Sequence, residues 1–225
     1  MLLLEKVAAG ANAGTDTQPR FARMRTAMPY VLVALVAGVY LYLFVRILTT
    51  TIDEGTYLYG AQLVEHGAVP FRDFPEVSTG GEFYWLALFF KLLGTSFLAA
   101  RTALWITGVA TVLLAFHLSR RIGGTGVFAA LFVLVTSIPL MTMNSPHYES
   151  NLFALAALAV FLRAETRDEC WTLFLSGVLA GAASCFLQQK GFYIAASFAV
   201  SILIVRRTDR LKRIGLAVGG YLSVM

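Results

Sequence analysis

The chain has 225 residues, a formal net charge of +5, 58% hydrophobic residues and 14% charged residues. Its apolar residues form long uninterrupted blocks instead of the alternating or amphipathic patterns of a soluble core. Its basic residues lie at the ends of these blocks and not in one patch, which argues against nucleic acid as a partner and indicates membrane lipid as the surroundings. The composition therefore predicts an all-α, polytopic membrane protein.

Residues 1–27 precede the first apolar block and are predicted to form a cytoplasmic tail. The opening Met-Leu-Leu-Leu run is too short for the core of a signal peptide and has no basic leader. We therefore expect the first span to remain in the protein as an uncleaved anchor.

Six blocks come close to the roughly 20 apolar residues that a membrane span needs. They are residues 28–48, 97–118, 126–143, 148–162, 171–187 and 192–205. A seventh begins near Ile214, but the residues that remain would form only about 18 Å of helix. The sequence predicts a transmembrane domain of six to seven spans over residues 28–225, and we interpret the chain as the N-terminal part of a longer protein or as a truncated product.

The charges at the ends of the blocks predict how the chain lies in the membrane. With the N-terminus in the cytoplasm, most basic residues fall inside: Arg20, Arg23, Arg25, Arg120, Arg121, Arg163, Arg167, Arg206, Arg207, Arg210, Lys212 and Arg213. Most acidic residues then fall on the outer face: Asp53, Glu54, Glu65, Asp73, Glu76, Glu82 and Glu149. The expected location is a plasma membrane, with an acidic outer surface.

The first outer loop, residues 49–96, is the longest segment between spans. Its pattern predicts a helix over residues 54–66 that Gly67 ends, an irregular stretch over 68–81, and an apolar helix over 82–93 that Gly94 ends. Both helices are too short to span a bilayer, so we expect them to lie at its surface. The other loops are brief, including an expected outer turn over residues 188–191.

Small residues and cysteines within the blocks have structural interpretations. Gly177 and Gly181 form a pair at four-residue spacing, which is typical of close helix packing. Cys170 and Cys185 lie about 22 Å apart along one predicted helix, too far for a disulfide.

Three motifs of the loop carry a resemblance. They are Ile-Asp-Glu-Gly-Thr-Tyr at residues 52–57, Gly-Ala-Val-Pro-Phe-Arg-Asp-Phe at 67–74, and Phe-Lys-Leu-Leu-Gly-Thr-Ser at 90–96 with Arg101 following. This pattern resembles the first outer loop of the C-type (GT-C) glycosyltransferase superfamily. The resemblance points to glycosyltransferase family 39, which contains protein O-mannosyltransferases, aminoarabinose transferases and transferases of lipopolysaccharide-core sugars.

The resemblance implies a transferase that takes its sugar from a polyprenyl-phosphate-linked donor at the outer face of a bacterial inner membrane. The acceptor would be an unidentified lipid, glycan or protein of the cell envelope. Because phosphate is already a good leaving group, one base suffices to deprotonate the acceptor hydroxyl, and in-line attack would invert the anomeric carbon. Asp53 would be that base, and Glu54 would raise its proton affinity or hold the acceptor. The competing interpretation of Asp53 is a helix N-cap.

The substrate-binding residues implied by the resemblance lie on the outer side. Asp73 matches an acidic position of the motif but would also suit a turn. Arg101 and Lys190 could hold the lipid-linked phosphate or extend to the interface. His147 and Glu149 fall where relatives often place a second acidic group, and the competing interpretation is that they are hydrated residues at the edge of a span. A divalent cation is conceivable, but no spacing specifies a metal site.

One departure separates this chain from many relatives. They carry Lys-Pro-Pro before the apolar helix, where this chain has Ser-Thr-Gly-Gly-Glu at residues 78–82. Two other functions compete with the transferase hypothesis. One is an inactive or accessory membrane protein, and the other is a component of a transporter or flippase, which the scarcity of charges inside the spans disfavours.

Overall fold

A computed structural model describes residues 20–47, 52–76, 79–140, 142–167, 169–205 and 208–225 of the chain. Within these ranges the regular structure is helical, with one isolated bridge between Pro70 and Phe74 and no named strand. The prediction of an all-α protein is therefore confirmed. Residues 1–19 of the predicted cytoplasmic tail lie outside the described residues, whereas residues 20–27 already belong to the helix α2.

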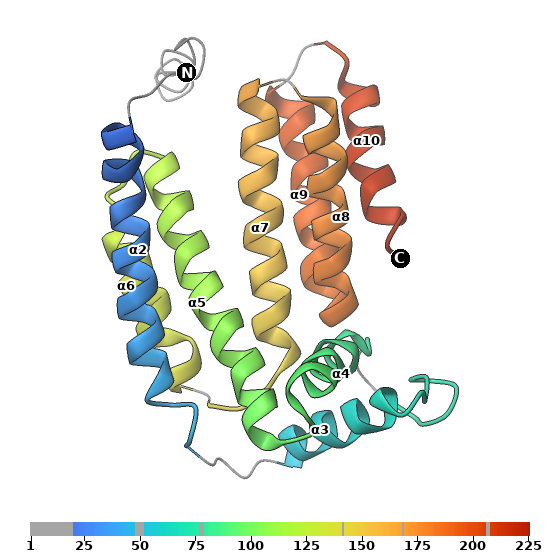
Figure 1. Ribbon diagram of the computed structural model, residues 1–225. Coiled ribbons are helices and arrows are strands. Elements are labelled where there is room, and N and C mark those ends of the chain that lie inside the picture. Colours follow the sequence, from blue (N-terminus) through green and yellow to red (C-terminus); the bar gives the residue numbers. More distant parts are fainter. Residues whose placement is uncertain (1–19, 48–51, 77–78, 141, 168, 206–207) are drawn as a thin grey trace.

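The long helices stand side by side, and two short helices lie across one end of them (Figure 1). The first group consists of α2 (Arg20–Tyr42), α5 (Phe97–Arg121) and α6 (Val127–Thr136), and the second of α7 (Pro146–Arg167), α8 (Cys170–Phe186), α9 (Gln188–Val205) and α10 (Arg210–Leu222). The two crossing helices are α3 (Ile52–Glu65) and α4 (Gly81–Leu93). We call the end that they cover the α3/α4 end.

Each group of long helices has its own buried apolar core. The core of the first group contains Ala37, Leu41, Leu104, Val112, Phe116, Leu134 and Ile138. The core of the second contains Ala157, Phe161, Leu173, Ala180, Phe198 and Ile202. A third cluster joins α3 and α4 to the start of α5 through Ala61, Leu86, Phe90, Ala100 and Ala103. This third core fixes the crossing helices on the bundle.

Small residues allow α8 and α10 to pack backbone to backbone. A Cβ atom on Gly177 would collide with the carbonyl of Ala217, and one on Gly220 would collide with the carbonyl of Phe174. A Cβ atom on Gly181 would come within 2.8 Å of the carbonyl oxygen of Tyr221. The packing interpretation of Gly177 and Gly181 is confirmed. Cys170 and Cys185 lie at opposite ends of α8 as free thiols, as predicted.

The two loop helices end where their glycines predict. Gly67 follows α3 with a φ of 96°, and Gly94 ends α4 with a φ of 84°, values that suit glycine because it has no Cβ. Asp53 lies inside the first turn of α3, one residue after the helix begins, and among the described residues no capping hydrogen bond is found for its side chain. The N-cap interpretation of Asp53 therefore has no support in the geometry.

Two described helices, Phe97–Arg121 and Gln188–Val205, are long and apolar enough to cross a membrane. Apolar helices of 10–17 residues cover Thr26–Tyr42, Val127–Thr136 and Cys170–Phe186. The expected span over residues 126–143 is wrong as one continuous helix, because α6 ends at Thr136 and a 3-10 turn, η1, follows at Ile138–Leu140. Pro139 has no N–H for a helical hydrogen bond, which accounts for the break. The expected turn over 188–191 is also wrong, since α9 already begins at Gln188.

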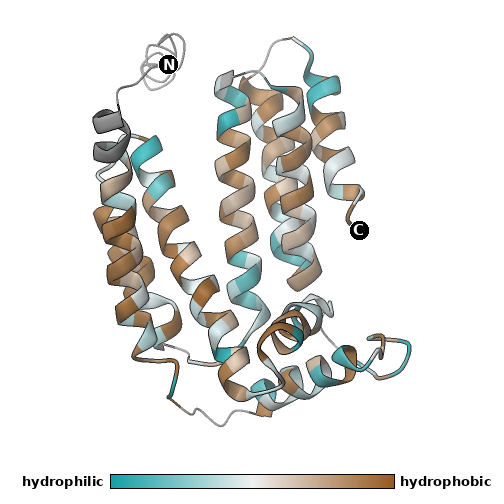
Figure 2. Cartoon of the chain, in the orientation of Figure 1, coloured by the Kyte–Doolittle hydropathy of each residue, from teal (hydrophilic) through white to brown (hydrophobic). Residues whose placement is uncertain are grey.

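Hydrophobic residues occupy much of the long helices (Figure 2), and many of their large side chains are exposed. Examples on α2, α6 and α9 that are at least half exposed are Met28, Leu32, Leu35, Val39, Phe128, Phe132, Phe192 and Ile204. A water-soluble monomer rarely exposes apolar surface on this scale. The surface is typical of a protein that lipid surrounds.

Candidate active site

The adjacent carboxylates of Asp53 and Glu54 have opposite environments in the first turn of α3. Asp53 is exposed, whereas Glu54 retains 3% of its accessible surface. Consecutive residues of a helix point about 100° apart, so the turn can direct one side chain into the protein and the other outward. Within the described residues, no hydrogen bond or ion pair to the Asp53 carboxylate is found.

Glu54 lies at the centre of a buried polar network. One carboxylate oxygen accepts a hydrogen bond from Nη2 of Arg101 at 2.9 Å, and the other accepts from the backbone N and Nδ2 of Asn144 at 2.9 and 3.0 Å. Arg101 also donates to the carbonyl of Thr142 and lies 4.6 Å from the ring centre of Phe97. The network ties α3 to α5 and to the segment that leads into α7.

Within this network, the predicted site residues Arg101 and Glu54 have a structural role. The guanidinium of Arg101 is fully buried and engaged with protein groups, so it neither extends to the interface nor faces an open phosphate site. The Glu54 carboxylate is buried and bonded to Arg101, whereas Asp53 is exposed. Both side chains hold the first turn of α3 in place, and Asp53 is attached to that turn.

Glu82 and Glu149 form a second buried acidic feature, where the start of α4 meets the start of α7. Each retains 1% of its accessible surface. Glu149 accepts a hydrogen bond from the hydroxyl of Thr107 at 3.2 Å, while both oxygens of Glu82 and Oε2 of Glu149 have no hydrogen-bond partner in the described part of the chain. Burial, and secondly the charge of Glu149, raise the pKa of Glu82 well above its usual range. Glu82 is therefore the better candidate to carry a proton.

Glu82 was not among the site residues that the sequence predicted. It was expected only as one of many acidic residues of the outer face. A signal was nevertheless present, because Glu82 is the one acidic residue in the apolar run from residue 82 to 93. An ionisable group at the start of such a run is costly to bury and therefore suggests a function.

A cavity of about 440 Å³ opens between α5, α6 and α7. Its polar lining comes from Thr111, Thr136, Ser137, Ser145, His147, Tyr148 and Asn151, and its apolar lining from Gly108, Val133, Ala154 and Leu155. Lys190 on α9 donates from Nζ to the carbonyl oxygen of His147 at 3.3 Å and to Oδ1 of Asn151 at 2.7 Å. The structure therefore groups Lys190 with His147 at the edge of this cavity.

Two links join this cavity to the acidic residues. Ser145 lines the cavity, and its neighbour Asn144 is bonded to Glu54. Tyr148 also lines the cavity, and its neighbour Glu149 is bonded to Thr107. The segment 144–149 therefore contributes to all three features. The structure brings Glu54, Arg101, His147, Glu149 and Lys190 around this segment, with Asp53 on the turn that Glu54 holds.

Asp73 lies apart from this group in an exposed turn. Its carboxylate accepts hydrogen bonds from Nε and Nη2 of Arg72 at 2.9 and 2.7 Å and from the backbone N of Val69 at 2.7 Å. The bond from Arg72, and secondly that from Val69, lower the pKa of Asp73 to about 2. Of the two interpretations of Asp73, the geometry favours the turn.

No group of three or more His, Cys, Asp or Glu side chains is placed to hold a metal ion in the part of the chain that the structure describes. Glu82 and Glu149 supply two acidic ligand groups and are joined by no third such side chain there. The residues present therefore do not specify a metal centre.

A protein-family model described as dolichyl-phosphate-mannose-protein mannosyltransferase matches residues 81–225, which is more than half of the chain. No curated protein and no solved structure matches the sequence. Of the predicted site residues, Arg101, His147, Glu149 and Lys190 lie inside the matched segment, and Asp53, Glu54 and Asp73 precede it. The chain therefore belongs to the dolichyl-phosphate-mannose-protein mannosyltransferase family of GT-C membrane glycosyltransferases.

Proposed function

We propose that this protein transfers a sugar from a polyprenyl-phosphate-linked donor to a lipid, glycan or protein acceptor, with Asp53 as the general base. The reaction takes place at the outer face of a bacterial inner membrane, with the N-terminus in the cytoplasm and six to seven spans in the bilayer. The observation that carries the proposal is the exposed Asp53 carboxylate on a helical turn that the buried Glu54–Arg101 ion pair immobilises.

The chemistry needs one base and a means to bind the donor phosphate. Asp53 takes the proton of the acceptor hydroxyl as this oxygen attacks the anomeric carbon. The bond from that carbon to the phosphate oxygen breaks, and the lipid phosphate leaves with the electron pair. Since attack and departure occur on opposite faces, the configuration inverts. A fixed carboxylate lowers the barrier because its position is set before the substrates arrive.

The cavity beside Lys190, which polar groups line in part, is the proposed place of the donor phosphate. Lys190 is the basic side chain bonded to the cavity residue Asn151, and an ammonium group can bind a phosphate as a point charge. In this chain Lys190 takes the part of the lysine that the Lys-Pro-Pro motif of relatives provides. His147 and the hydroxyl groups of the cavity can donate further hydrogen bonds to the sugar phosphate.

The proposal is tested by transfer of radiolabelled sugar from a polyprenyl-phosphate pool in membranes that contain the protein. Asp53→Asn removes the base with little change in size, so we expect the rate to fall about 10²- to 10⁴-fold. Glu65→Gln is the matched control, because it neutralises another acidic residue of α3, whose carboxylate accepts from the hydroxyl of Thr95 at 2.6 Å. The control should keep the rate of the unmodified protein.

Two results would contradict the assignment of Asp53. If Asp53→Asn keeps the full rate while Glu149→Gln loses it, the base lies in the buried acidic pair instead. If the inserted and folded protein transfers no sugar from any polyprenyl-phosphate pool, the accessory interpretation replaces the enzymatic one.

A further inference from the structure

A second cavity lies at the opposite end of the bundle from α3 and α4, and we call it the arginine pocket. Its volume is about 570 Å³, and it opens between α2, α5 and α7. Its lining residues are Thr26, Tyr30, His117, Arg120, Arg121, Ala159, Val160 and Arg163. Three of these eight side chains are arginines and none is acidic, so the pocket carries positive charge.

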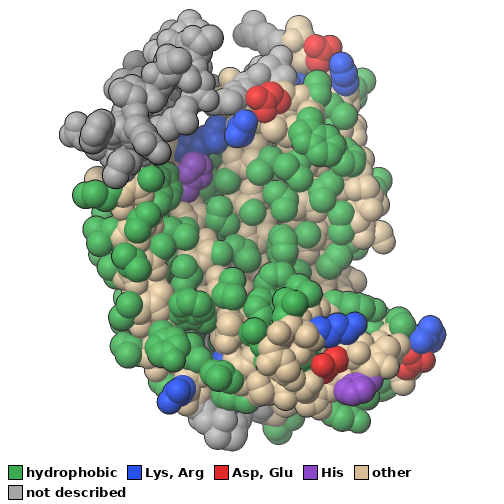
Figure 3. All heavy atoms as spheres, viewed as in Figure 1, with side chains coloured by type: hydrophobic (Ala, Val, Ile, Leu, Met, Phe, Trp, Pro, Cys, Tyr) green, Lys and Arg blue, Asp and Glu red, His purple; other side chains and the backbone are tan. Residues whose placement is uncertain are grey.

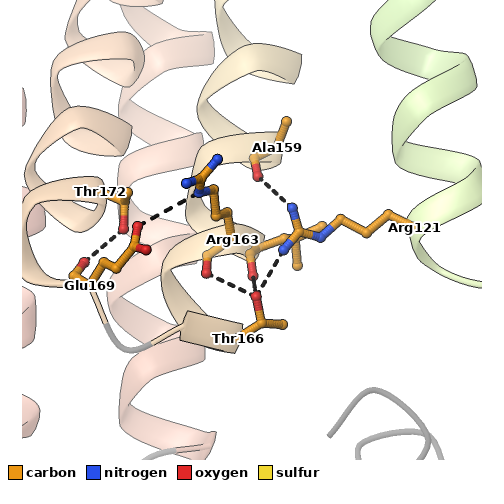
Figure 4. Close-up of polar contacts among 7 residues, drawn as sticks. Arg121, Ala159, Arg163, Thr166, Glu169 and Thr172 are labelled. Carbon is orange, nitrogen blue, oxygen red and sulfur yellow. Dashed lines mark hydrogen bonds and ion pairs between the residues drawn. The ribbon is translucent and has the colours of Figure 1, made fainter. Parts of the chain in front are cut away.

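The guanidinium groups of the pocket are held by the protein. Arg121 reaches from α5 to α7, where it donates to Oγ1 of Thr166 at 2.9 Å and to the carbonyl oxygen of Ala159 at 3.4 Å (Figure 4). The guanidinium of Arg120 lies 5.6 Å from the ring centres of both Tyr30 and Phe116. These contacts position the donors before a ligand binds, which reduces the entropy lost on binding.

One arginine of the pocket has an acidic partner that is itself exposed. Nε of Arg163 lies 3.6 Å from Oε2 of Glu169, and the two side chains are 51% and 38% exposed, so water screens this pair (Figure 4). The arginine pocket therefore retains an excess of cationic donors.

Neutral hydrogen-bonding groups complete the lining. The hydroxyl of Tyr30 and Nδ1 of His117 are bonded to each other at 3.0 Å. Arginine forks together with hydroxyl and imidazole groups match the several oxygens of a phosphate group better than a single carboxylate. The chemistry of the pocket thus favours a phosphate.

The surroundings indicate that this phosphate belongs to a lipid. Met28, Leu32, Leu35 and Val39 of α2 are each more than 60% exposed, and their spacing places them along the face of the helix that is turned away from the pocket, as expected of a helix in contact with membrane lipid. In the space-filling view, basic and histidine side chains gather near this end of the bundle, directly above a hydrophobic surface (Figure 3). A headgroup at the basic site would leave its acyl chains beside the hydrophobic surface directly below it (Figure 3).

We propose that the arginine pocket binds the phosphate group of an anionic membrane lipid. Basic pockets between membrane helices are a recurrent form of lipid-headgroup site. This site is separate from the proposed catalytic residues and does not depend on the transferase reaction, because its occupancy is measured as binding.

The test measures lipid retention by native mass spectrometry of the purified protein in detergent. Dioleoyl phosphatidylglycerol is the probe, and dioleoyl phosphatidylcholine, with the same acyl chains and no net charge, is the reference. We expect the anionic lipid to be retained preferentially, and Arg120→Gln to weaken its binding about fivefold, with a similar loss when Arg163→Gln is added. Lys212→Gln is the matched control, because Lys212 is an exposed cation at the start of α10 outside the pocket.

Three outcomes would overturn the proposal. The first is equal retention of the two lipids by the unmodified protein. The second is a loss with Lys212→Gln as large as that with Arg120→Gln, which would reflect surface charge in general. The third is displacement of the lipid by inorganic phosphate at equal concentration, which would assign the pocket to free phosphate. Unchanged thermal unfolding of each variant in the same detergent verifies that the comparison concerns folded protein.

Discussion

The two ends of the helical bundle use charged residues in different ways. At the α3/α4 end, Arg101 and Glu54 are buried and bonded to each other, and Glu82 and Glu149 are buried side by side. At the end with the arginine pocket, Arg120 is exposed and Arg163 is half exposed. The first arrangement fixes geometry at short range, and the second leaves positive charge available to a ligand.

The difference predicts how tolerant each end is to mutation. A buried ion pair contributes little net stability when it forms, but removal of one partner leaves an uncompensated charge in a medium of low polarity. An exposed cation remains hydrated, and its loss changes electrostatic attraction more than folding. Substitutions of charged residues at the α3/α4 end should therefore lower the free energy of unfolding. Substitutions in the arginine pocket should instead lower the affinity for a ligand.

The largest effect on stability is expected for Arg101→Gln. This change leaves Glu54 buried beside Asn144 without its charged partner, and we expect the free energy of unfolding to fall by about 3–5 kcal/mol. Unfolding by sodium dodecyl sulfate titration in detergent micelles measures the loss. The double variant Arg101→Gln with Glu54→Gln should recover part of it, and a loss below about 1 kcal/mol in the single variant would show that the pair is not the buried anchor inferred here.

For Glu82→Gln we expect a smaller change in the free energy of unfolding, and one that depends on pH. Burial and the nearby Glu149 raise the pKa of Glu82, so the folded protein keeps this proton to a higher pH than the unfolded chain. Stability is then highest below the ordinary pKa of glutamate and falls as the pH rises to the raised value. Glu82→Gln removes this fall, and it should stabilise the protein at about pH 8 but change little at about pH 5.

Thermal unfolding of the two proteins at both pH values tests this expectation. A gain of roughly 1 kcal/mol at the higher pH would appear as a rise of about 2–4 °C in Tm. Glu65→Gln, on the neighbouring helix, should leave the pH dependence unchanged. An equal gain at both pH values would indicate a packing effect of glutamine and not a titration.

The smallest effect on folding is expected for Arg163→Gln. Its pair with Glu169 is long, at 3.6 Å, and half exposed, so the free energy of unfolding should change by about 0–1 kcal/mol. The same detergent titration used for Arg101→Gln measures it. A loss as large as that for Arg101→Gln would remove the contrast between the two ends.

Much of the fold could be predicted because it depends on local patterns. Gly67 and Gly94 ended the loop helices as expected, and Gly177 packs closely against α10. Residues 126–143 were misjudged because hydrophobicity alone indicated a span, while Pro139 and the non-helical backbone at Ser137 interrupt the helix. Hydrophobicity alone does not show whether an apolar segment is one continuous helix or is interrupted by such a local break.

Less of the candidate site could be predicted, because its contacts join residues far apart in the sequence. Glu54 is buried because it is bonded to Arg101 and Asn144. No residue spacing in the loop predicts these partners. The pairing of Glu82 with Glu149 likewise arises from the packing of α4 against α7. Asp73 was the exception, since its two principal partners, Arg72 and Val69, lie within four residues.

The glycine pair before α4 limits how this chain can exchange sequence with its relatives. Gly80 has a φ of 74°, which proline cannot adopt, and a Cβ atom on Gly81 would collide with the backbone of Cys185 at the end of α8. Grafting the Lys-Pro-Pro motif of relatives into this position would therefore force α4 away from α8. The two glycines therefore set how closely α4 can approach α8, and a larger residue at either position should separate the two helices.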